Sequence, residues 1–152
     1  SLLACMLLSV KSLGAAARDT LWGARTDAGY GFLRRDVHQY DVMMADLRTG
    51  WVAASFGGKL VSAQHPLAFV SEDEQRTRRA DVKSFFDAAT SQSERERLLE
   101  KYGASYVFAP RHQSTDAPVV SDDSLRALGM VTHEDGRFLL VRVNVRATDA
   151  NR

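Results

Sequence analysis

The sequence has little of what several common protein classes need. Its one cysteine, Cys5, can form no disulfide within the chain and has no partner for a Cys-x-x-Cys metal site. Acidic and basic residues are mixed along the chain and nearly cancel to a net charge of +1, so no basic stripe is available for nucleic-acid phosphates. The G-x-G-x-x-G, G-x-x-x-x-G-K-[ST] and G-x-S-x-G motifs are absent. Nucleic-acid binding and the common nucleotide and serine-nucleophile sites are therefore disfavoured.

A long hydrophobic run is also missing. The first ten residues, SLLACMLLSV, are apolar, but Lys11 interrupts them short of the roughly 20 apolar residues that a membrane span needs. The basic start and small-residue cleavage site of a signal peptide are hard to find. Three interpretations stay open for this segment: a buried helix of the domain, the tail of a membrane span, or an artificial end. We give the buried helix the most weight.

What the chain does contain fits an ordinary globular domain. Of its 152 residues, 45% are hydrophobic and 26% are charged, which is enough for one domain with a core. Short apolar segments bounded by turn residues predict strands at residues 40–46, 59–63, 104–109, 130–133 and 138–143. Apolar residues at helical spacing predict helices at residues 2–22, 48–56 and 121–128, and in the two segments that begin at Ser71 and Ser91.

The two central helices have clear end signals. Ser71 with Glu74 and Ser91 with Glu94 both fit the capping-box pattern, in which side chains satisfy amide groups at the helix start. Gly103 stands where a left-handed C-terminal cap belongs. The five arginines of these segments alternate with acidic residues and predict a solvated, salt-bridged helix face rather than a basic patch. They are Arg76, Arg78, Arg79, Arg95 and Arg97.

Strands that alternate with helices predict a parallel sheet covered on both faces. Asp135-Gly136 predicts a two-residue turn and hence a C-terminal β-hairpin. We therefore expect a small three-layer α/β domain, Rossmann-like or flavodoxin-like in outline, with a mainly parallel sheet. The expected organisation is an N-terminal helix and loop at residues 1–30, near a membrane in one interpretation, then the α/β domain at 31–145 and a disordered tail at 146–152.

Two polar residues follow strands at the edge where open α/β sheets place their ligands. Asp46 follows the first strand, but Arg48 occupies the position where a phosphatase-type D-x-D motif needs its second acid. His65 follows the second strand, and Trp51 offers a surface on which a sugar could stack. A helix cap for Asp46, a loop hydrogen bond for His65 and a core position for Trp51 are the favoured alternatives to ligand binding. We expect no catalytic residue and no cofactor in the chain, and its four histidines lack zinc-ligand spacing.

A series of motifs from Tyr40 to Val143 gives a family resemblance. Asp46 is followed by Gly57-Gly58-Lys59-Leu60-Val61, His65-Pro66, Arg78 through Val82 to Phe85-Phe86, Thr90-Ser91 through Glu94-Arg95, and Tyr102-Gly103 through Tyr106-Val107. This order resembles the C-terminal extracytoplasmic domain of bacterial polytopic membrane glycosyltransferases of the GT-C, mannosyltransferase-like type.

The resemblance implies a function for the parent rather than for this chain alone. Such a parent lies in the bacterial inner or plasma membrane and transfers a sugar from a polyprenyl-phosphate donor, with its catalytic acids among the membrane helices. This chain would then be a non-catalytic accessory domain on the periplasmic or outer side. Its partners would be the membrane-embedded part of the same protein and a polyprenyl-linked sugar or glycan acceptor. The alternatives are a stand-alone small-ligand-binding α/β module and, most weakly supported, a small phosphotransfer enzyme using Asp46.

Overall fold

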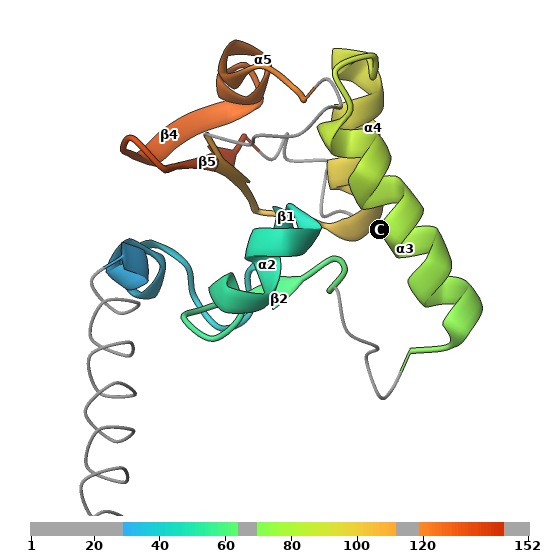
Figure 1. Cartoon of the computed structure of the whole chain (residues 1–152), viewed down its shortest axis with the longest axis horizontal. Helices are drawn as coiled ribbons and strands as arrows, with labels where there is room; N and C mark the ends of the chain where they lie inside the picture. Colours follow the sequence, from blue (N-terminus) through green and yellow to red (C-terminus); the bar gives the residue numbers. More distant parts are fainter. Residues whose placement is uncertain (1–28, 64–69, 112–118, 145–152) are drawn as a thin grey trace, which may run out of the picture. The chain divides into compact units, whose positions relative to one another are not determined.

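A five-stranded mixed sheet is the centre of the computed structural model, which describes residues 29–63, 70–111 and 119–144 (Figure 1). The strands are β1 (Val42–Ala45), β2 (Lys59–Leu60), β3 (Tyr106–Pro110), β4 (Gly129–Glu134) and β5 (Phe138–Val143). The contacts between residues divide the chain into two compact units, Ser1–Phe32 and Leu33–Arg152. In the first unit, described residues 29–32 are helical. The sheet belongs to the second.

The sheet has the strand order β2-β1-β3-β5-β4. β1 pairs in parallel with both β2 and β3, while β5 is antiparallel to β3 and to β4. The fold is therefore α/β, as predicted, and the C-terminal hairpin lies at one edge. The expectation of a mainly parallel sheet was wrong, because β5 inserts beside β3 and makes the second half of the sheet antiparallel.

Among the described residues, residues 29–36 are helical, and four further helices follow the order that the sequence predicts (Figure 1). They are α2 (Leu47–Ala53), α3 (Glu72–Phe86), α4 (Gln92–Tyr102) and α5 (Asp122–Arg126). Side-chain oxygens cap each helix start, and Gly103 ends α4 with a left-handed φ of 58°. None of the helices in the described ranges is both long and apolar enough to cross a bilayer. The helix expected at residues 2–22 and the tail at 146–152 lie outside the described residues.

The main core lies between one face of the sheet and helices α3, α4 and α5. Alternate strand residues point to this face, as the two-residue period of a strand requires. Its buried residues include Met44 of β1, Val107 of β3, Leu139 and Val141 of β5, Phe85 of α3, Leu98 of α4 and Leu125 of α5. Helix α2 packs against side chains of the opposite face, because a Cβ on Gly50 would lie 3.3 Å from Cβ of Ala45 and 3.5 Å from a methyl of Leu60.

A buried arginine joins α3 to α4. Arg95 is only 3% exposed, although the sequence predicts that it lies on a solvated helix face. Its Nε donates to the carbonyl of Phe85 at 3.0 Å, and one terminal nitrogen donates to the carbonyl of Asp87 at 2.6 Å. The end of α3 carries carbonyls that lack a partner within the helix, and Arg95 satisfies two carbonyls at this end. The prediction for Arg95 was therefore wrong.

The hairpin turn also differs from the prediction. β4 ends at Glu134 and β5 begins at Phe138, so three residues connect the strands rather than two. Oδ1 of Asp135 accepts hydrogen bonds from the backbone amides of Arg137 and Phe138, each at 2.7 Å. Gly136 is not among the glycines with positive φ, as a two-residue Asp-Gly turn would require. The Asp135 side chain holds the turn in place of a left-handed glycine.

Candidate functional site

The carboxyl ends of β1 and β3 form the first candidate site. After β1 the chain crosses to β2 on one side, and it later returns to β3 on the other side of β1. Open α/β sheets bind ligands in the crevice at such a point, because the connections leave in opposite directions there. Asp46 follows β1 and Arg111 follows β3. These two residues mark the edge at which a ligand would be expected.

Asp46 is the N-cap of α2. Its Oδ2 accepts hydrogen bonds from the backbone amides of Arg48 at 3.0 Å and Thr49 at 3.2 Å, and from the Thr49 hydroxyl at 3.3 Å. The structural alternative considered for Asp46 is thus confirmed. Within the described ranges its Oδ1 makes no hydrogen bond, so ligand binding by Asp46 stays a prediction.

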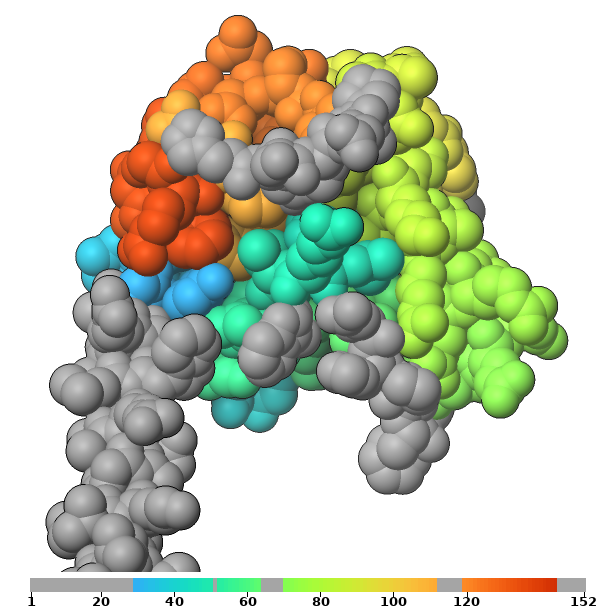
Figure 2. All heavy atoms as spheres, in the orientation of Figure 1, coloured from blue at the N-terminus to red at the C-terminus, as the bar shows by residue number. Residues whose placement is uncertain are grey.

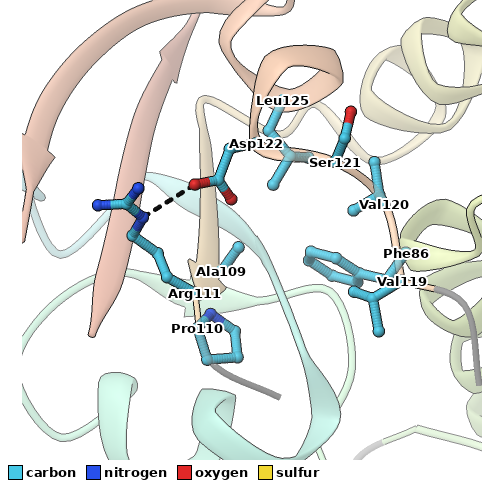
Figure 3. Close-up of a pocket in the computed structure, with 9 residues that line it drawn as sticks. All are labelled: Phe86, Ala109, Pro110, Arg111, Val119, Val120, Ser121, Asp122 and Leu125. Carbon is cyan, nitrogen blue, oxygen red and sulfur yellow. Dashed lines mark hydrogen bonds and ion pairs between the residues drawn. The ribbon is translucent and has the colours of Figure 1, made fainter. Parts of the chain in front are cut away.

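A cavity of about 370 Å³ opens beside the end of β3. Figure 3 shows Arg111 and Asp122 facing each other at one side, with Phe86, Val119 and Val120 across the cavity from them. Its volume lies within the range of small-molecule sites. The full lining is Phe86, Ala109, Pro110, Arg111, Val119, Val120, Ser121, Asp122 and Leu125.

The polar groups of this cavity are already bound to one another. Nε of Arg111 lies 2.8 Å from Oδ2 of Asp122, and its Nη1 lies 2.8 Å from the Asp135 carbonyl and 3.1 Å from Glu134. Glu134 in turn lies 2.6 Å from Arg126. Arg111 thus links the end of β3 to α5 and to the hairpin. The cavity therefore presents apolar side chains on one side, and on the other an arginine and an aspartate that are bound to each other.

The far wall of the cavity is held by backbone contacts. The amide of Val120 donates to the carbonyl of Phe86 at 3.0 Å, and Val119 forms an antiparallel bridge with Asp87. The end of α3 therefore fixes the segment that leads into α5. Because Arg95 bonds the Phe85 and Asp87 carbonyls in this same turn, it also supports this wall.

Ligand binding by the three residues that the sequence singles out stays a prediction. Asp46 is a helix cap, Trp51 is a residue of α2, and His65 lies outside the described residues. Sequence reasoning missed Arg111 and Asp122 as cavity residues, and the only available signal was a charged residue directly after the third apolar strand. Among the described residues no group of three or more His, Cys, Asp and Glu side chains could hold a metal ion.

Comparison with known proteins adds no family to this picture. No protein-family model matches the sequence, and no curated protein matches it.

Proposed function

We propose that this chain is a non-catalytic accessory domain of an integral membrane glycosyltransferase-like protein. In this proposal it lies on the periplasmic or outer side of a bacterial inner or plasma membrane, beside the membrane-embedded part, and assists the binding of acceptor or donor sugar. One observation carries the proposal: among the described residues, those that give the family resemblance hold successive parts of a single fold. Residues with such structural roles are the ones that related domains would be expected to share.

The Gly-Gly motif supports this view. A Cβ on Gly57 would lie 2.7 Å from the Val37 carbonyl oxygen, closer than real Cβ contacts. Gly58 has a φ of 74°, a left-handed conformation that residues with a Cβ rarely adopt. Both glycines are thus needed in the connection between α2 and β2.

The later motifs have equally specific structural roles. Phe85 is fully buried in the core, and Arg95 binds the carbonyls at the end of α3. Gly103 supplies the left-handed cap of α4, and the Tyr106 hydroxyl donates to the Asp36 carbonyl at 2.6 Å. The resemblance therefore concerns the framework, while ligand-binding residues would differ among relatives.

We also propose that the fold is a small three-layer domain of the Rossmann-like or flavodoxin-like type. The order β2-β1-β3 at the parallel end is the order in which flavodoxin-like sheets begin. Helix α2 lies against Ala45 and Leu60 on one face, while Val82 of α3 and Leu98 of α4 belong to the core on the other.

The reading frame that encodes this chain tests the proposal. We expect several apolar membrane spans encoded before residue 1, with an acidic loop after the first span. The tagged full-length product should stay in the membrane pellet after an alkaline carbonate wash. A short gene without spans, whose product is recovered in the supernatant, would contradict the proposal.

A stand-alone small-ligand-binding module is the second candidate function. The observation that favours it is the cavity beside Arg111, at the edge where such modules bind ligands. The same experiment separates the two candidates, because this module requires a short gene.

A further inference from the structure

A second cavity lies at the other end of β1 and β3, away from the first. It has a volume of about 520 Å³ and is formed where β1 and β3 begin and β5 ends. This volume is also within the range of small-molecule sites. Its lining residues are Asp36, His38, Asp41, Ser105, Tyr106, Arg142, Val143 and Asn144.

The polar side chains of this cavity have hydrogen-bonding capacity left. In the part of the chain that the structure describes, no hydrogen bond or ion pair involves the His38 imidazole, the Ser105 hydroxyl, the Arg142 guanidinium or the side-chain amide of Asn144. Asp41 uses only Oδ2, which accepts from the His38 backbone amide at 2.8 Å. The cavity beside β3 is the reverse case, because its arginine and aspartate are bound to each other.

The backbone behind these side chains is fixed. The amide of Ser105 donates to the Val42 carbonyl at 2.8 Å, and the amide of Val143 donates to the Ser105 carbonyl at 2.9 Å. The buried Tyr106 donates its hydroxyl to the Asp36 carbonyl at 2.6 Å. A ligand would therefore meet preformed walls, which lowers the entropy lost on binding.

The charges at the cavity nearly cancel. The Asp36 carboxylate is paired with Arg35 at 2.8 Å, which leaves Arg142 and Asp41 as one positive and one negative group. Burial raises the pKa of Tyr106, Arg142 opposes the rise, and Asp41 and Asp36 add to it, so both signs act on this one ring. A phosphate or carboxylate would gain from Arg142 but would be repelled by Asp41.

We infer that this cavity, lined by His38, Asp41, Ser105, Arg142 and Asn144, binds a neutral saccharide. Each sugar hydroxyl both donates and accepts a hydrogen bond, and the cavity offers donors and acceptors side by side without net charge. The inference rests on the proposed function for the source of the sugar, a glycan or polyprenyl-linked donor. It places sugar binding at the amino ends of β1 and β3 rather than at Asp46.

Titration of the ¹⁵N-labelled chain tests the inference. The probe is an α-linked mannotriose, with inorganic phosphate and serine as the anionic and zwitterionic comparisons. We expect saturable shifts of the Asp41, Ser105 and Asn144 amides with mannotriose, at a Kd of about 1 mM or tighter. Neither comparison should reproduce them. No saturable shift of these amides with mannotriose, or saturation by phosphate or serine in its place, would overturn the inference.

Two variants and a control locate the binding. Arg142→Met keeps the apolar stem and removes the donors, and we expect it to weaken mannotriose binding at least about tenfold, as for loss of one charged hydrogen bond. Asn144→Ala should weaken binding in the same direction. Arg137→Met removes another exposed arginine, one that lies beside Asp135 in the hairpin turn, and should leave binding unchanged. Equal binding by all three variants would refute the site.

The outcome of this titration is independent of the outcome of the test of the proposed function. Binding is measured on the isolated chain, whereas the membrane spans are read from its gene and from cell fractions. A chain that binds mannotriose at these residues but comes from a short soluble protein would keep the site and refute the accessory-domain proposal. Membrane spans without binding would do the opposite.

Discussion

Replacement of Arg95 by methionine should destabilise the domain more than any change at its neighbouring arginines. The Arg95 side chain is 3% exposed and donates to two carbonyls, of Phe85 at 3.0 Å and of Asp87 at 2.6 Å. Arg95→Met retains most of the apolar stem, so the variant isolates the loss of these hydrogen bonds. It removes the donor of the Phe85 carbonyl and one of the two donors of the Asp87 carbonyl, which keeps the hydrogen bond from the Thr90 backbone amide at 3.2 Å.

The expected size follows from the bonds that are lost. A hydrogen bond to a charged group contributes about 1.5–3 kcal/mol, and two adjacent bonds are not fully additive, so we expect a loss of about 3 kcal/mol in the free energy of unfolding. This is a large part of the roughly 5–15 kcal/mol that stabilises a typical domain. With a urea m-value of about 2 kcal/mol per molar, the unfolding midpoint should fall by about 1.5 M.

Urea unfolding followed by circular dichroism measures this shift. Arg97→Met is the matched control, because Arg97 is exposed and its pairing with Glu94 lies on the surface of α4. We expect the control to unfold close to the wild-type midpoint, since exposed ion pairs contribute little. An Arg95→Met midpoint within about 0.3 M of wild type, a shift of roughly 0.6 kcal/mol at this m-value, would refute the structural role given to Arg95.

Two further predictions concern the end of α4. Gly103→Ala should lower the free energy of unfolding by about 1 kcal/mol because φ is 58°, and the new Cβ would meet no atom within 4 Å that could add to this cost. Gly136→Ala is the control, because that site is equally open but its φ is not positive. It should change stability little in the same urea assay. Burial raises the pKa of Asp81, but hydrogen bonds from Lys101 and Tyr102 outweigh it and leave the pKa below its usual value. The Asp81 carboxylate thus stabilises the fold above the unfolded-state pKa near 4, and this contribution is lost as pH falls through the folded pKa. Asp81→Asn should cost about 1–2 kcal/mol at pH 7, and its gap to wild type should narrow below about pH 4; a gap independent of pH would contradict this.

Features set by nearby residues could be predicted from the sequence. Ser71 accepts from the amide of Glu74, and Ser91 accepts from the amide of Glu94, as the capping-box pattern requires. Only this half of each box is present among the hydrogen bonds of the described residues, because the Glu74 side chain bonds Arg78 and the Glu94 side chain bonds an arginine one turn away. The left-handed cap at Gly103 was confirmed as well.

Features that depend on distant partners could not be predicted. Helical spacing places Arg95 among charged neighbours, but nothing in that pattern shows that the end of α3 lies within reach of its guanidinium. The pairing of Arg111 with Asp122 and the insertion of β5 beside β3 likewise depend on the arrangement of the sheet. The role of Asp46 was ambiguous for another reason, since the same position after a strand serves both helix caps and ligands.

Accessibility of this domain in intact cells tests the central claim most directly. Met130 is 56% exposed on β4, so Met130→Cys, made in a full-length protein from which Cys5 and every other cysteine have been removed, gives one reactive thiol. We expect a membrane-impermeant maleimide, small enough to cross any outer layer, to label it in intact cells as fully as after lysis. The cysteine-free parent should stay unlabelled, and a cytoplasmic cysteine protein should react only after lysis. Labelling of the Met130→Cys protein only after lysis would place the domain in the cytoplasm and contradict the account.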